Sequence, residues 1–109
     1  MNEEELNSWL TKHDKINQAT EFCKNYIEGC LENDPEGFRP EIVEYDQSRV
    51  RTELEDAYVK TTSAFVKNYQ YVEICLQVYY LHDSIGYYKC FFETDNGNYV
   101  DDYWVNTAR

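Results

Sequence analysis

Residues 71–80 have the sequence YVEICLQVYY, in which apolar side chains recur at every second position. Such alternation is typical of a β-strand that turns one face toward a core. The core-facing set is Val72, Ile74, Leu76 and Val78. This stretch therefore predicts a sheet with an apolar face and a second face of different character.

Two further strands are predicted after it. A turn at 82–86 leads into a strand at 87–94, and Asp95-Asn96-Gly97-Asn98 leads into a strand at about 99–105. Asn-Gly tolerates the positive φ that tight hairpin turns need. A two-residue turn would put Val100, Asp102 and Trp104 on the face opposite the core. A three-residue turn with a glycine bulge would instead put Tyr99, Asp101 and Tyr103 there.

Upstream of these strands, apolar residues recur in steps of three and four, as on one side of a helix. A first helix is expected at about 3–32, with a capping box at Asn2 and Glu5 and either no break or one near His13-Asp14. A second is expected at about 48–69, from Val50, Leu54, Ala57, Tyr58, Thr61, Ala64, Phe65 and Tyr69.

The expected fold class is α+β, with one domain over residues 1–109. Its two N-terminal helices, at about 3–32 and 48–69, would pack on one face of a three-stranded antiparallel meander. The strands of that meander are those at about 71–80, 87–94 and 99–105. Residues 37–46, which include Pro40, are expected to form a loop or a short edge strand.

The chain carries 21 acidic and 10 basic residues, for a net charge of -11. Binding to nucleic acid or to an anionic membrane draws its affinity from lysine and arginine, so the charge argues against both as direct partners. It favours a basic partner, although acidity for solubility alone is the alternative. Most of the surplus acid lies in residues 1–45, with 11 acids and 4 bases, and in 71–109, with 6 acids and 2 bases.

The four cysteines form no CxxC pair and no zinc-binding spacing. We expect reduced cysteines in a core, with a Cys75–Cys90 cross-strand disulfide as the alternative. No apolar run approaches the roughly 20 residues of a membrane span, and the acidic start is unlike a secretory signal. A cytoplasmic location is therefore expected.

No catalytic site is expected from the sequence. His82-Asp83-Ser84 has the residue types of a hydrolase triad, but neighbours in one turn cannot adopt the triad's geometry. Asp101 and Asp102 would point to opposite faces of a strand. Residues 95–99 lack the final glutamate of a calcium loop, and no phosphate-loop or dinucleotide signature occurs. We expect no enzyme activity, no metal and no cofactor.

The predicted outer face of the sheet mixes aromatic rings with charge. It comprises Tyr71, Glu73, Cys75, Gln77, Tyr79, Tyr87, Lys89, Phe91 and Glu93. Rigid aromatic side chains are enriched at binding hot spots, so this composition favours protein recognition. The alternatives are that the rings only stabilise the sheet, that 37–46 covers them, or that two copies pair through this face.

The leading hypothesis is a small acidic inhibitor that covers a basic surface of an enzyme acting on nucleic acid. In size and charge the chain resembles nuclease immunity proteins, DNA mimics and anti-CRISPR proteins. The acids expected to contact the partner are Glu93, Asp95, Asp101 and Asp102. The expected apolar anchors are Tyr87, Phe91 and Trp104.

Two other functions are considered. Helices followed by a meander are similar to cystatin-like and NTF2-like folds, in which a curved sheet wraps a pocket. That similarity implies a small-ligand-binding or enzymatic module, with a pocket lined by Tyr26, Tyr58, Tyr80 and Tyr88. The third hypothesis is a homodimeric structural protein that pairs through the outer face.

Overall fold

The computed structural model of the chain describes residues 1–34, 42, 44–64 and 67–106. Within these residues the elements are α1 (Glu3–Lys12), α2 (Lys15–Asn33), a short 3₁₀ helix η1 (Gln47–Arg49), β1 (Val50–Ala64), β2 (Lys67–Tyr80), β3 (Asp83–Glu93) and β4 (Tyr99–Asn106). The strands form one antiparallel meander in the order β1-β2-β3-β4. The α+β prediction is confirmed, with two α-helices and an antiparallel sheet, but the sheet has four strands and not three.

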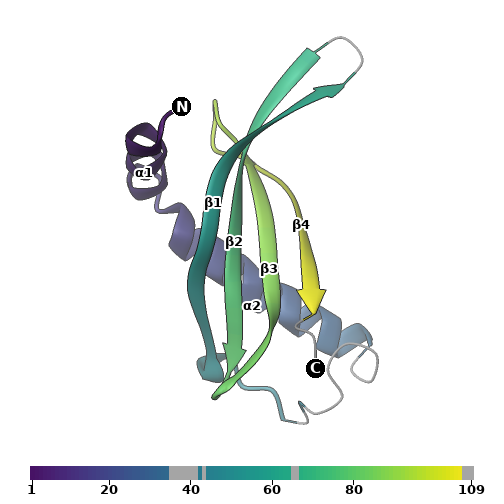
Figure 1. Cartoon of the computed structure of the whole chain (residues 1–109). Coiled ribbons are helices and arrows are strands. Elements are labelled where there is room, and N and C mark those ends of the chain that lie inside the picture. The colour runs from purple at the N-terminus through teal and green to yellow at the C-terminus, as the bar shows by residue number, and fades with distance from the viewer. Residues whose placement is uncertain (35–41, 43, 65–66, 107–109) are drawn as a thin grey trace.

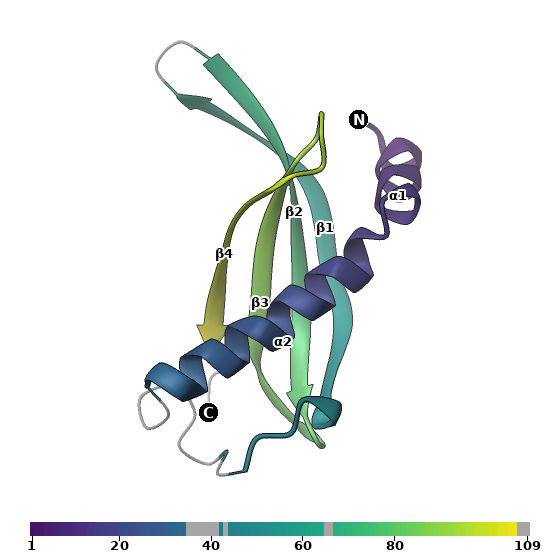
Figure 2. The same ribbon diagram turned by 180° about the vertical axis from the view of Figure 1, so that it is seen from behind.

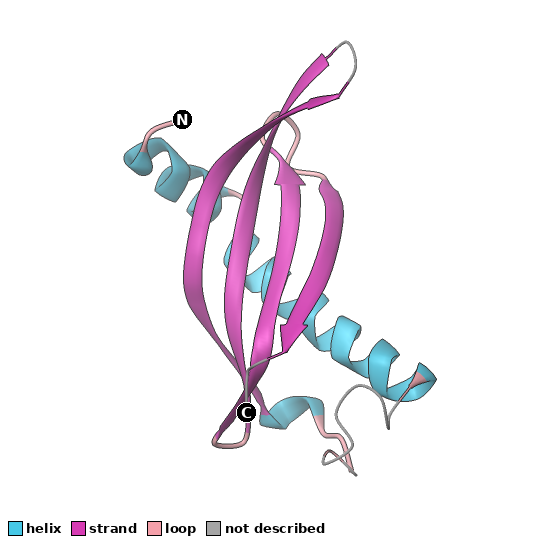
Figure 3. Ribbon diagram, turned by 45° about the vertical axis from the view of Figure 1, so that its right-hand side comes forward, coloured by secondary structure: helices cyan, strands magenta, loops and turns pink. Residues whose placement is uncertain are grey.

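Both helices lie on the same side of the sheet. Figures 1 and 2 show α2 crossing that side diagonally, from beside the middle of β1 toward the lower end of β4. Figure 3 shows the strands as one curved layer with the helices behind it. Among the described elements, none lies over the opposite side, which we call the outer face.

The predicted second helix at 48–69 is wrong, because the described residues of this segment form the end of η1, β1 and the start of β2, and Phe65 lies outside them. A β-bulge between Leu54 and Asp56 shifts the alternation of β1 by one residue. The residues of β1 on the helix side are therefore Val50, Thr52, Leu54, Ala57 and Val59. Within this set, Val50, Leu54 and Ala57 are four and three residues apart, which is also the spacing of apolar residues on one side of a helix.

The first predicted helix is divided into α1 and α2 at the break that the sequence left open. Asn2 caps α1: its Oδ1 accepts a hydrogen bond from the Glu5 backbone N–H (2.8 Å), and the Glu5 side chain accepts one from the Asn2 N–H (3.3 Å). Asp14 has a left-handed backbone with φ of 52°. This conformation interrupts the helical hydrogen bonds and allows α2 to start in a new direction.

The core lies between α2 and the helix side of the sheet. Its fully buried residues include Ala19, Cys23, Ile27, Val72, Ile74, Leu76, Val78, Tyr88, Cys90 and Phe92. The predicted core-facing set of β2 is thereby confirmed. All four cysteines lie in the described ranges and are free. Cys75 faces the outer side and Cys90 pairs with Ile74 on the helix side, so the alternative disulfide is not formed.

The helices are tied to the turn between β3 and β4. The Trp9 indole Nε1–H donates a hydrogen bond to the Thr94 carbonyl (3.2 Å). The buried Lys15 ammonium donates to the Gly97 carbonyl (2.5 Å) and lies 4.4 Å from the centre of the Phe92 ring. These contacts join residues more than 80 positions apart and fix the turn against the start of α2.

Stability should fall in alkaline solution because buried acids must ionise. Burial raises the pKa of the Cys23 and Cys90 thiols from 9.0 to about 12. A pKa that is higher in the folded chain stabilises the fold fully below the unfolded pKa, and that contribution is lost as the pH rises toward the folded value. Lys15, whose pKa is lowered by burial, acts in the opposite direction, but burial also raises the pKa of Tyr45 and Tyr88, which adds to the loss of stability.

We therefore expect the thermal unfolding midpoint of the reduced protein to fall by at least about 5 °C between pH 8.5 and pH 10.5. The decline should be shallower in a Cys23→Ala, Cys90→Ala double variant. Circular dichroism melts at several pH values measure both. An unchanged midpoint across this range would contradict the prediction.

Candidate functional site

The outer face combines aromatic rings with carboxylates. Its described residues are Arg51, Glu53, Asp56, Tyr58, Lys60, Tyr71, Glu73, Cys75, Gln77, Tyr79, Tyr87, Lys89, Phe91, Glu93, Asp101, Tyr103 and Val105. The bulge residue Glu55 lines a hollow on the same side. The set predicted from β2 and β3 is confirmed by their register. Among these described residues, six aromatic rings and six carboxylates, Glu55 included, accompany three basic side chains.

The register of β4 follows neither predicted turn completely. Asp101 pairs with Phe91 and Tyr103 pairs with Lys89, so both lie on the outer face as the three-residue turn predicted. Tyr99, however, pairs with Phe92 on the helix side. The register shift at this point leaves Val100 as an extra residue, and this reverses the face that Tyr99 occupies.

Asp102 and Trp104 lie on the helix side, so the expectation that placed them on the outer face is wrong. Trp104 stacks on Tyr26 of α2, with ring centres 6.3 Å apart. Asp102 accepts hydrogen bonds from the hydroxyls of Tyr88 (2.6 Å) and Tyr99 (2.8 Å). Both side chains therefore help to hold β4 to the helix side of the fold.

Four of the seven predicted contact residues lie on the outer face. They are Tyr87, Phe91, Glu93 and Asp101. Asp95 is exposed in the turn between β3 and β4, which α1 contacts through Trp9. The structure therefore brings together two of the four predicted acids and two of the three predicted anchors.

An aromatic row crosses the outer face at Phe91. The Phe91 ring stacks on Tyr103 of β4 at 5.8 Å and meets Tyr71 of β2 edge-on at 6.5 Å. The Lys89 ammonium lies 5.6 Å from the centre of the Tyr103 ring. These cross-strand contacts join three strands and give the outer face a rigid apolar centre.

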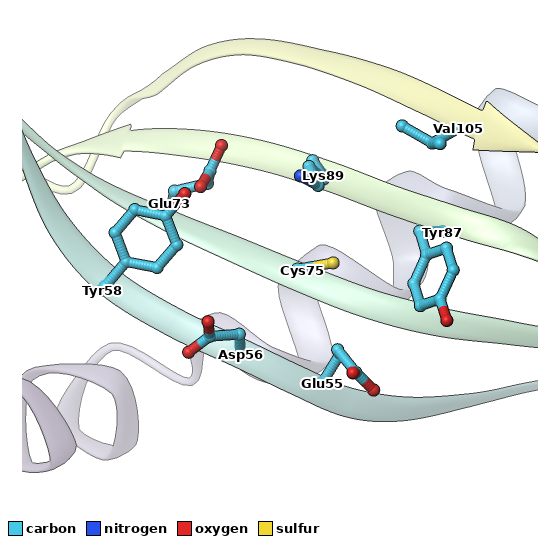
Figure 4. Close-up of a pocket in the computed structure, with 8 residues that line it drawn as sticks. All are labelled: Glu55, Asp56, Tyr58, Glu73, Cys75, Tyr87, Lys89 and Val105. Carbon is cyan, nitrogen blue, oxygen red and sulfur yellow. The ribbon is translucent and has the colours of Figure 1, made fainter.

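Two hollows flank this row. The larger, of about 310 Å³, is lined by Glu55, Asp56, Tyr58, Glu73, Cys75, Tyr87, Lys89 and Val105. The other, of about 240 Å³, is lined by Lys60, Tyr71, Phe91, Val100 and Asp101. Figure 4 shows the larger hollow, with Glu55 and Asp56 along its β1 side and Glu73 beside Tyr58.

The burial of Glu73 on the outer face is not predicted by the sequence. Its side chain is on the outer face, yet only 1% of the residue is exposed. It stands between Tyr58 and Phe91, its partners on the neighbouring strands. Its Oε2 is buried and has no hydrogen-bond partner in the described part of the chain. A lone glutamate in an alternating strand gives no sequence signal for such burial.

Cys75 and Lys89 line the same hollow. Burial raises the pKa of the Cys75 thiol, so this cysteine is protonated at neutral pH and is a poor nucleophile. Burial lowers the pKa of Lys89, but Tyr103 and Glu73 raise it by more, and the ammonium stays charged. Across residues 1–34, 42, 44–64 and 67–106, no cluster of three histidine, cysteine or acidic side chains could hold a metal ion.

The four tyrosines expected to line an internal pocket do not come together around one site. Tyr26 packs against Tyr88 at 5.6 Å in the core, whereas Tyr58 is on the outer face. The Tyr80 hydroxyl donates to the Glu44 carbonyl near η1. A separate hollow of about 390 Å³ between α2 and β4 is lined by Phe22, Asn25, Tyr26, Tyr99 and Asp102.

The chain was compared with known proteins in three ways. No family model, no curated protein and no solved structure matches it. In the part that the structure describes, neither helix has the length and apolar character needed to cross a membrane.

Proposed function

We propose that this protein is an inhibitor that covers a basic, nucleic-acid-binding surface of an enzyme with the outer face of its sheet. The observation that supports this proposal is the composition of that face. Six aromatic rings and six carboxylates lie there with three basic side chains, and no described element covers them. Carboxylates at this density can occupy the positions of phosphates on a basic surface.

Among the described residues, one of the six carboxylates of the outer face forms an ion pair. Arg51 forms an ion pair with Glu53 and lies 4.1 Å from the centre of the Tyr79 ring. The other ion pairs found among the described residues, Lys24–Glu21 and Arg49–Asp46, lie outside this face. Together with the net charge of -11, the remaining acids would accelerate association with a basic partner.

The apolar anchors in this proposal are Tyr87, Phe91 and Tyr103. They are half-buried or exposed on adjacent strands, and Phe91 and Tyr103 already stack in one orientation. Rings that are held in place before binding lose little conformational entropy on contact. Tyr103 takes the place of Trp104, which packs against α2.

The homodimer hypothesis is less consistent with this composition. Two copies facing each other would bring twelve carboxylates and six basic groups together, at six and three from each copy. Like charges in contact oppose association. Light scattering should therefore show a monomer, and a concentration-independent dimer would favour pairing through this face.

The small-ligand hypothesis is associated with the 390 Å³ hollow between α2 and β4. Its one carboxylate, Asp102, already accepts a hydrogen bond on each oxygen, from Tyr88 and Tyr99. The Asp102 carboxylate is therefore already engaged and has few free acceptor positions with which to orient a ligand. Partner binding through the outer face is the better-supported function.

The proposal predicts that neutralising acids on the outer face weakens partner binding. A Glu53→Gln, Glu93→Gln, Asp101→Asn variant should bind its partner about tenfold more weakly, since exposed charges contribute about 0.5 kcal/mol each. The wild type is first used to isolate the partner from lysate at low salt. Binding of each variant to the purified partner is then measured at low and high salt, together with the partner's activity on nucleic acid.

The matched control is Glu4→Gln, Glu28→Gln, Glu32→Gln, which removes the same charge from exposed positions on the helices. It should retain wild-type binding and inhibition. Equal binding by the two triple variants, or a partner whose action on nucleic acid is unaffected, would contradict the proposal.

A further inference from the structure

The larger hollow of the outer face contains a carboxylate oxygen that lacks a partner. Glu73 Oε2 is buried, and no donor in the described part of the chain reaches it. No ion pair within 4.0 Å joins Glu73 to Lys89, although both line the hollow. A buried carboxylate oxygen without a hydrogen-bond partner is unfavourable, so the site gains when a donor group enters it.

The other walls of the hollow also favour a cation. The bulge in β1 brings two consecutive acids, Glu55 and Asp56, to the same rim. With Glu73 they give three carboxylates against the single ammonium of Lys89. Such an excess of negative charge in a concave site attracts and concentrates cations.

The aromatic side chains at the hollow narrow the choice of cation. Tyr58 and Tyr87 stand at its two ends, and Cys75 lies between them (Figure 4). A guanidinium is planar, weakly hydrated and able to stack on aromatic rings while donating to carboxylates. A lysine ammonium is more strongly hydrated and loses its charge more readily when buried.

We propose that this hollow receives one arginine side chain from the basic partner, with the guanidinium donating to Glu73. This inference rests on the proposed function and identifies its central contact. The volume of about 310 Å³ is at the lower end of ligand-binding pockets, which suits one side chain. The aromatic row at Phe91 would then contact the partner surface around that arginine.

The test uses small probes and does not require the partner. N-acetyl-arginine amide is titrated into the isotope-labelled full chain, and backbone amide NMR signals of Tyr58, Glu73 and Cys75 are followed. We expect saturable binding with a dissociation constant of the order of 1 mM. N-acetyl-citrulline amide has a similar shape without the charge, and it should bind at least about tenfold more weakly. The affinity of N-acetyl-lysine amide should lie between those of the arginine and citrulline probes.

Variants identify the carboxylate. Glu73→Gln should reduce affinity for the arginine probe at least about tenfold, because it replaces the carboxylate acceptor by an amide and keeps the shape. Glu28→Gln, which neutralises an exposed acid on α2 away from the hollow, should leave the affinity unchanged. Equal binding of the citrulline probe, shifts confined to other regions, or no effect of Glu73→Gln would overturn the inference.

A second readout is independent of binding. Since Glu73 Oε2 is buried without a hydrogen-bond partner in the free protein, Glu73→Gln should raise the thermal unfolding midpoint by about 4 °C. A lower midpoint would show that the carboxylate is already satisfied and would overturn the inference. If the arginine probe fails but the outer-face triple variant still loses the partner, only the arginine site is wrong. If the probe binds but both triple variants retain the partner, the proposed function is wrong.

Discussion

Replacing Phe92 with alanine is expected to lower the free energy of unfolding by about 4 kcal/mol, which is typical of a large ring removed from a core. Phe92 is 0% exposed. Its ring contacts Trp9 of α1 at 6.5 Å and stacks on Phe22 of α2 at 6.2 Å. It also lies beneath the buried ammonium of Lys15. The substitution would therefore loosen both helices at once.

Phe91→Ala is the matched control, because the same ring is removed one residue earlier from the opposite face. Phe91 is half-buried and contacts Tyr71 and Tyr103, so its loss should cost about 1 kcal/mol. Urea denaturation of both variants measures the difference. The effect on partner binding should be the reverse: Phe91→Ala should bind the partner more weakly than Phe92→Ala. Equal losses of stability would contradict the assignment of the two faces.

Gly86→Ala is expected to cost about 3 kcal/mol through overpacking. A Cβ added at Gly86 would lie 2.6 Å from the Val105 carbonyl oxygen and 2.6 Å from Trp104 Cζ2. The carbonyl belongs to the backbone of β4, so it cannot move without disturbing the pairing of β3 with β4. Weaker hydrogen-exchange protection of β4 should accompany the lower stability.

Gly29→Ala offers the opposite expectation. A Cβ at Gly29, within α2, would have nothing within 4 Å, and alanine favours a helix over glycine by about 0.5–1 kcal/mol. Thermal melts should therefore show Gly29→Ala unfolding at a higher temperature than the wild type. A destabilised Gly29→Ala together with a neutral Gly86→Ala would contradict the packing around β3 and β4.

The sequence predicted best where one periodicity continued without interruption. In β2, side chains alternate regularly over residues 71–80, and both faces were assigned correctly. The same holds for Tyr88, Cys90 and Phe92 of β3. A buried strand between two neighbours has a strongly specified register, because a slip of one residue would exchange core and surface.

The missed strand, β1, has an interrupted periodicity. Its bulge at Glu55 adds one residue, and the helix-side sequence Val50, Leu54, Ala57 then matches a helix. The β-branched and aromatic residues Thr52, Tyr58, Val59 and Thr61 were the available signal for a strand. Because the sequence predicts a helix for β1, it does not place the acids Glu55 and Asp56 near Glu73.

The sequence predicts the composition of the candidate site better than the positions and burial of its individual residues. The aromatic and acidic character of the outer face followed from the alternation of β2 and β3. Asp102 and Trp104 were misplaced because a register shift near Val100 depends on how two strands pair, which local sequence does not specify. The burial of Glu73 depends on partners from two other strands, and such contacts are visible only in the folded chain.

The contacts of α1 and α2 with the last turn have a consequence for how the chain is made. Trp9 and Lys15 find their partners at Thr94 and Gly97, which are synthesised more than 80 residues later. Until that turn has left the ribosome, the apolar side of α2 lacks much of the surface that buries it. Completion of this fold must therefore follow translation of the β3–β4 hairpin, and a nascent chain ending before Thr94 should bind chaperones.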